Sequence, residues 1–149
     1  MKKLAFVALL VLFVAGLFVF FTGEVVGLAP KPVSNCNRVA PTVTAYTSAN
    51  QSAPGTQLVY PIMVTNNNVG PGCGTTQFNL LDINIHGWTT SISTPTFDLC
   101  SGSGYCNTTW VYYRVTSPVT ATSGTYDFYL VGFETGQMQA NVIRVDYII

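Results

Sequence analysis

The pattern of hydrophobic and polar positions divides the chain into two parts. Eighteen apolar residues run from Leu4 to Phe21, directly behind Lys2 and Lys3. A helix of that length reaches roughly 27 Å at about 1.5 Å per residue, close to the hydrocarbon thickness of a bilayer. From about Pro30 onwards, apolar and polar residues alternate in short runs. The pattern therefore predicts one N-terminal hydrophobic helix followed by an all-β domain.

Residues 1–29 have two interpretations. Their apolar run exceeds the usual core of a signal peptide, about 7–15 residues, which favours an uncleaved transmembrane anchor. Gly27 and Ala29 stand where the last positions before a cleavage site would be, which favours a signal peptide. In both cases the N-terminal lysines stay on the cytoplasmic side, so the domain is expected at the cell membrane facing outward, or secreted. Residues 30–40 are expected to form a linker that leads into the domain.

A pilin-like filament subunit is an alternative, because such subunits also join an apolar N-terminal helix to a β-domain. They have a different order, in which an acidic residue lies near the start of the apolar helix. Here the first acidic residue, Glu24, follows the apolar run. The order therefore favours a membrane-targeting segment.

Alternation with a period of two predicts about seven short strands in residues 41–149 and no helix. Strands are expected at residues 42–46, 57–66, 77–85, 91–93, 96–99, 108–116, 124–134 and 140–149. Short strands separated by turn signals at this spacing are typical of an immunoglobulin-like antiparallel β-sandwich. That fold is our prediction for residues 41–149.

Two strands contain irregular positions. Pro61 cannot donate to a β-ladder, which predicts a sheet edge or a bulge beside it. In residues 77–85 the apolar side changes from Phe78 and Leu80 to Leu81 and Ile83. A change of side within one strand predicts a β-bulge near Leu80.

The four cysteines Cys36, Cys73, Cys100 and Cys106 are an even set on the exported side, where disulfides persist. Four cysteines allow three pairings. The flexible stretch between Cys100 and Cys106 favours a local pair, which leaves Cys36 with Cys73. Zinc is disfavoured because closely spaced cysteine pairs are absent and His86 is the only histidine.

A family resemblance rests on several short motifs. They are Cys36-Asn37-Arg38, Pro54-Gly55-Thr56, Gly87-Trp88, Val115-Thr116-Ser117-Pro118 and Gly124-Thr125-Tyr126. The chain resembles the immunoglobulin-like repeats of NEW3 and fibronectin type III-like kind that are appended to exported prokaryotic glycosidases, peptidases and surface proteins. The resemblance implies a non-catalytic spacer or accessory module. It also implies that Tyr126 forms a tyrosine corner, with its ring inward and its hydroxyl bonded to nearby backbone.

Enzymatic chemistry is not expected. His86 is the only candidate general base, and no nucleophile elbow accompanies it. The carboxylates are scattered and show no calcium-binding motif, so no cofactor or metal is expected either. Nucleic acid is a poor partner, because only one lysine and three arginines lie beyond residue 30 and they form no basic stripe.

Aromatic residues provide a candidate binding face. Alternation places Tyr129 and Phe133 outward, and Tyr112 or Tyr113 of the neighbouring long strand would join them. Such a face could stack on a surface glycan or meet an envelope protein, because tyrosine has an apolar ring and a polar tip. The alternative is that these rings only cover their own sheet.

The sequence thus predicts a non-catalytic cell-surface or secreted module with a structural or interaction role. A carbohydrate- or protein-binding module and an accessory subunit of an exported enzyme are the alternatives. The sequons at Asn50 and Asn107 predict glycosylation in a host that has the machinery. The last strand could also pair with a neighbouring copy through its edge.

Overall fold

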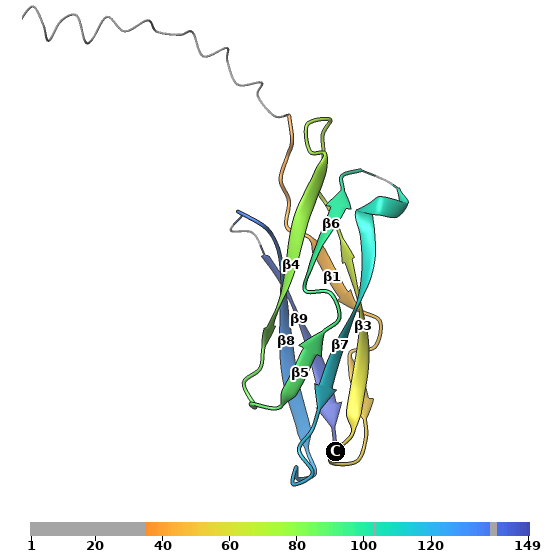
Figure 1. The fold of residues 1–149 in the computed structure, drawn as a ribbon, viewed down its shortest axis with the longest axis vertical. Coiled ribbons are helices and arrows are strands. Elements are labelled where there is room, and N and C mark those ends of the chain that lie inside the picture. The colour runs from red at the N-terminus through yellow and green to blue at the C-terminus, as the bar shows by residue number, and fades with distance from the viewer. Residues whose placement is uncertain (1–34, 103, 138–139) are drawn as a thin grey trace, which may run out of the picture. The chain divides into compact units, whose positions relative to one another are not determined.

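Nine strands and one 3-10 helix make up the described part of the computed structural model, residues 35–102, 104–137 and 140–149 (Figure 1). The strands are β1 Thr42–Ala45, β2 Ala49–Gln51, β3 Gln57–Thr65, β4 Thr75–Ile83, β5 Thr89–Ile92, β6 Thr96–Cys100, β7 Thr108–Thr116, β8 Thr125–Glu134 and β9 Ala140–Ile148. The 3-10 helix η1 spans Tyr105–Asn107. One sheet has the strand order β1-β3-β7-β5 and the other has the order β2-β9-β8-β4-β6.

These two sheets confirm the prediction of an all-β, two-sheet domain. The structure has one strand, β2, outside the eight expected ranges, and the prediction of purely antiparallel pairing is wrong at this place, because β2 runs parallel to β9. The predicted N-terminal helix lies outside the described residues. Within the residues that the structure describes, no helix is long and apolar enough to cross a membrane.

The core lies between the two sheets and is built by the period-two alternation. The predicted inner face of β3 is confirmed, since Tyr60, Ile62 and Val64 are buried. The other long strands contribute Phe78, Val111, Tyr113, Val115, Phe128, Leu130, Val145 and Tyr147. Each fully buried aliphatic or aromatic side chain stabilises the fold by about 1.5–3 kcal/mol. β-Branched and aromatic residues suit these half-buried strands, which explains why the alternation predicts them.

Pro61 lies where the edge prediction expects it. β1 pairs with β3 only from Ile62 to Thr65. Pro61 is the next residue, and its carbonyl accepts a hydrogen bond of 2.9 Å from the Tyr46 amide. The proline therefore lies beyond the end of the β1 ladder, where its missing N–H leaves no ladder bond unmade.

The predicted β-bulge near Leu80 is wrong. β4 pairs with β8 without interruption from Phe78 to Ile83. Asp82 takes the next inner position, where its carboxylate accepts hydrogen bonds from the Tyr113 hydroxyl at 2.7 Å and from the Thr90 hydroxyl. Because hydrogen bonds satisfy the Asp82 carboxylate at this inner position, β4 keeps its register. The apolar side chains of Leu81 and Ile83 therefore face solvent.

The expected position of Tyr126 is confirmed. Its ring packs against the core, and its hydroxyl donates a hydrogen bond of 2.9 Å to the Thr122 carbonyl. A tyrosine at the start of β8 thus holds the preceding loop against the end of the sandwich.

Two buried tyrosines make the fold sensitive to alkali. The Tyr60 hydroxyl donates to the Asp146 carbonyl at 2.8 Å, and the Tyr113 hydroxyl donates to Asp82. Burial raises the pKa of both phenols well above the ordinary value of about 10, and the hydrogen bond to Asp82 raises the pKa of Tyr113 further. Both groups stay protonated in the folded chain at pH values where the unfolded chain loses their protons.

We expect the free energy of unfolding to fall as the pH rises above about 10, because the unfolded state then binds fewer protons than the folded state. Urea unfolding at pH 9, 10 and 11 measures this slope. Tyr113→Phe removes one of the two groups and should make the slope shallower. An unchanged slope in Tyr113→Phe would show that Tyr113 does not contribute to it.

Candidate binding surface

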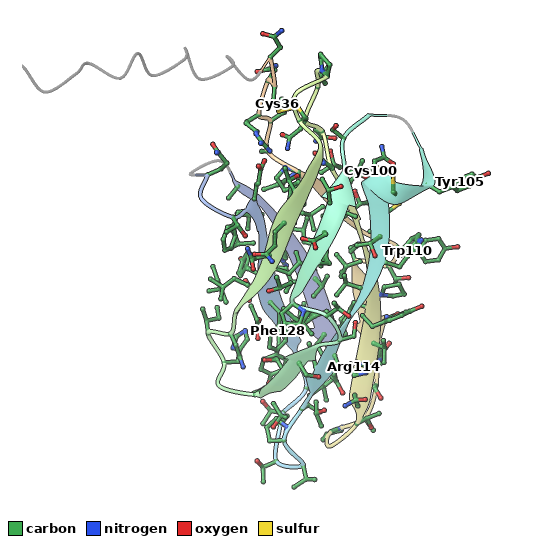
Figure 2. The ribbon with its side chains drawn as sticks, turned by 45° about the horizontal axis from the view of Figure 1, so that its top comes forward. Cys36, Cys100, Tyr105, Trp110, Arg114 and Phe128 are labelled. Atoms are coloured by element: carbon green, nitrogen blue, oxygen red, sulfur yellow. A yellow bond between two sulfur atoms is a disulfide. The ribbon has the colours of Figure 1, made fainter. Side chains whose placement is uncertain are left out.

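The outer face of the β1-β3-β7-β5 sheet carries exposed aromatic side chains. The alternation that buries Val111 and Tyr113 turns Trp110 and Tyr112 outward, and they are 50% and 45% exposed. Tyr46, which directly follows β1, is 79% exposed. Figure 2 shows Trp110 pointing away from the sandwich. We call Tyr46, Trp110 and Tyr112 the aromatic face.

Strand pairing places other apolar residues between these rings. Met63 of β3 lies opposite Trp110, and Pro61 lies opposite Tyr112. Neighbouring strands lie about 4.8 Å apart, and residues two apart on one strand about 6.7 Å apart. The rings of Tyr46 and Trp110 meet edge to face, with their centroids 6.3 Å apart. The aromatic face is therefore a continuous apolar surface across three strands.

Tyr105 adds another exposed aromatic side chain just before the start of β7. It lies in η1 and is fully exposed, on the same side of the molecule as Trp110 in Figure 2. The disulfide between Cys100 and Cys106 closes the loop that carries it.

The four residues of the predicted binding face do not share one surface. The prediction is wrong for Tyr113, which is fully buried. Tyr129 and Phe133 are half-buried on the outer side of the other sheet, so only Tyr112 lies on the aromatic face. Alternation gives the side of a strand on which a residue lies, but it does not give the sheet that the strand joins. The sequence prediction missed Trp110. The alternation along β7 already places it on the same side of the strand as Tyr112.

The outer side of the second sheet carries charged groups. The Tyr129 hydroxyl donates to Asp127 at 2.6 Å, which lowers the pKa of Asp127 and raises the pKa of Tyr129. Arg144 forms an ion pair with Asp146 at 2.6 Å, which raises the pKa of the arginine. Next to this cluster lie the exposed apolar side chains of Leu81, Ile83 and Val142.

His86 is packed among aromatic rings. Its ring centroid lies 5.3 Å from that of Phe128, 5.4 Å from that of Tyr126 and 6.0 Å from that of Trp88. Its Nε2 atom lies 3.4 Å from Asp127 Oδ1 but makes no well-aligned hydrogen bond. Among the described residues, no group of three histidine, cysteine or acidic side chains could hold a metal ion.

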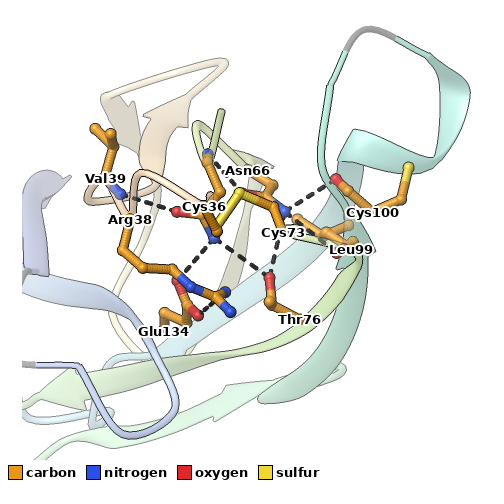
Figure 3. Close-up of a disulfide and its surroundings, with 10 residues drawn as sticks. Cys36, Arg38, Val39, Asn66, Cys73, Thr76, Leu99, Cys100 and Glu134 are labelled. Carbon is orange, nitrogen blue, oxygen red and sulfur yellow. Dashed lines mark hydrogen bonds and ion pairs between the residues drawn. A yellow bond between two sulfur atoms is a disulfide. The ribbon is translucent and has the colours of Figure 1, made fainter. Parts of the chain in front are cut away.

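The two disulfides lie at one end of the sandwich and have the favoured pairing. Cys36 is bonded to Cys73, and Cys100 to Cys106, with Cα atoms 4.6 Å and 5.4 Å apart. Figure 3 shows the first bridge beside the ion pair between Arg38 and Glu134. The buried Glu134 carboxylate also accepts a hydrogen bond of 2.8 Å from the Asn68 amide. The bridge and the ion pair both fix the first described segment against the rest of the domain.

A shallow depression of about 350 Å³ lies near this end. It is lined by Asn66, Asn67, Asn68, Val69, Gly102 and Asn107. The Asn66 amide donates to the Leu99 and Cys100 carbonyls, and the Asn68 amide donates to Glu134. Because internal partners occupy these amides, the depression is better explained as part of the structural network than as a ligand site.

The two sequon asparagines are half-buried. Asn50 lies in β2, and Asn107 ends η1, where its side-chain oxygen accepts a hydrogen bond of 3.0 Å from the Thr108 hydroxyl. Glycosylation at both positions stays a prediction.

The comparisons with known proteins support the fold alone. No family model matches the chain, and no curated protein matches it. Among solved structures, a family 123 glycoside hydrolase from Clostridium perfringens is similar over 74% of this chain, with a TM-score of 0.52 and 9% identity. A FixG-related protein from Vibrio parahaemolyticus is similar over 78% of this chain, with a TM-score of 0.50 and 10% identity. The match spans 27% of the hydrolase chain and 97% of the FixG-related chain.

Proposed function

We propose that residues 35–149 form an immunoglobulin-like, non-catalytic module that works outside the cell and binds carbohydrate through the aromatic face. The exposure of Tyr46, Trp110 and Tyr112 on the outer face of one sheet is the observation that carries this proposal. Aromatic rings offer large, rigid apolar surfaces on which the C–H faces of sugar rings can stack. The rest of this sheet face carries mainly threonine and serine hydroxyls, which can exchange hydrogen bonds with sugar hydroxyls.

The chemistry of the domain suits an exported location. Disulfides form and persist chiefly where the surroundings are oxidising, and all four described cysteines are paired in two of them. We propose that the apolar N-terminal segment of the sequence brings the domain there, as an anchor or as a cleaved signal.

We expect Trp110→Ala and Tyr112→Ala each to weaken binding to a polysaccharide at least tenfold, since aromatic anchors dominate such contacts. Affinity electrophoresis against a panel of neutral and acidic polysaccharides finds the ligand. The same electrophoresis compares both variants with the unaltered chain, and fluorescence titration adds a second readout for the proteins that keep Trp110, the more exposed of the two tryptophans.

Tyr129→Ala is the matched control, because it removes a tyrosine ring from the opposite outer face. It should leave binding unchanged. The proposal fails if no polysaccharide retards the protein, or if Trp110→Ala binds as tightly as the unaltered chain.

A structural role in an envelope assembly is the second candidate. It is favoured by the exposed apolar side chains of Leu81, Ile83 and Val142 on the other sheet, which would suit a protein contact. The two candidates use opposite outer faces, so Trp110→Ala would impair the first and leave the second intact.

A further inference from the structure

The sheet that carries the aromatic face has a single charged side chain on its outer side, that of Arg114. Its other outward residues are hydroxyl, amide, apolar or aromatic. All acidic side chains that point outward from a sheet belong to the other sheet, among them Asp98, Asp127 and Asp146. The outer side of this sheet is therefore weakly cationic, although the described residues as a whole hold three arginines against five acidic side chains.

Arg114 has no ion-pair partner among the described residues. The other two arginines there are paired, Arg38 with Glu134 and Arg144 with Asp146. The cross-strand neighbours of Arg114 are Val59 and Ser91, which carry no charge. The Arg114 side chain is half-buried, and without an acidic partner its guanidinium is available to an external anion.

Arg114 also lies in line with the aromatic rings. It follows Tyr112 by two positions and Trp110 by four on β7, about 7 Å and 13 Å along the strand. All three side chains project on the same side of the strand. A sugar stacked on Tyr112 would hold a ring substituent within reach of the guanidinium, which binds carboxylates with two parallel hydrogen bonds.

We propose that the aromatic face is selective for acidic polysaccharides, with Trp110 and Tyr112 stacking on sugar rings and Arg114 binding a sugar carboxylate. This inference rests on the proposed function. Because the described residues carry more acidic than basic groups, general attraction to a polyanion does not explain such selectivity, and the local charge of Arg114 has to supply it.

Polygalacturonate and its methyl ester are suitable probes, because they share one backbone and the ester replaces each charged carboxylate by an uncharged methyl ester. We expect the unaltered protein to bind the acid about three- to tenfold more tightly than the ester, as one exposed charge-assisted contact supports. Arg114→Gln should bind both polymers equally and match the unaltered protein on the ester. Added salt should reduce the preference of the unaltered protein.

Arg144→Gln is the control for net charge, since it removes an arginine from the opposite outer face. It should keep the full preference for the acid. Equal binding of both polymers by the unaltered protein, or a preference that survives Arg114→Gln, overturns the selectivity while carbohydrate binding stands. Binding of neutral polysaccharides without any binding of polygalacturonate would also overturn the selectivity and leave the proposed carbohydrate binding in place. If no polysaccharide binds, the proposed function fails and this inference fails with it.

Discussion

Replacement of both Cys36 and Cys73 by alanine should lower the free energy of unfolding by about 4 kcal/mol. The bridge joins residues 37 positions apart, and a crosslink that closes a longer loop removes more conformational entropy from the unfolded chain. Since small domains are stable by only about 5–15 kcal/mol, this loss would consume much of the total. Urea unfolding of the oxidised protein and the variant, followed by circular dichroism, measures the difference.

The second bridge is the matched control. Cys100 and Cys106 are only six positions apart, so the same model gives a loss of about 2 kcal/mol for their alanine variant. Equal losses for the two variants would show that loop length does not govern the stabilisation. Mass spectrometry of unreduced peptides would confirm the pairing in the starting material.

Phe128→Ala should also lower the free energy of unfolding by about 4 kcal/mol, because it leaves a cavity where a fully buried ring contacts other rings. Phe128 is completely inaccessible, and its centroid lies 5.3 Å from that of His86 and 5.5 Å from that of Trp88. Urea unfolding again gives the loss. Phe128→Leu is a milder variant that keeps the comparison available if the alanine variant does not fold.

Phe133→Ala tests the same truncation on the other side of β8. This ring is only half-buried on the outer side of the sheet, so the expected loss is on the order of 1 kcal/mol. A loss as large as that of Phe128→Ala would contradict the assignment of the two rings to opposite sides of the strand.

The long strands could be predicted from the sequence because each has a period-two pattern of its own. Alternation predicts a strand at residues 108–116, and β7 spans Thr108–Thr116. The pattern does not predict β2, because Ala49–Gln51 has no apolar alternation and is held only by pairing with β9. Pairing between distant segments leaves no local pattern to read.

Prediction of the binding face is limited for the same reason, because the sheet that a strand joins depends on pairing between distant segments. Alternation along β7 separates Trp110 and Tyr112 from the buried Tyr113, and this separation was visible in the sequence. The predicted companions Tyr129 and Phe133 belong to the other sheet, whose membership depends on strand order. Asp82 is a further case, because its inner position depends on hydrogen bonds from Tyr113 and Thr90.

The first disulfide also determines how the domain would bear tension. A pull on the chain before Cys36 passes through the sulfur atoms to Cys73 and enters the fold just ahead of β4. Residues 37–72, which include β1, β2 and β3, lie outside this path of force. Tension that enters ahead of Cys36 would therefore bypass β3, the strand that places Met63 and Pro61 opposite the rings of Trp110 and Tyr112.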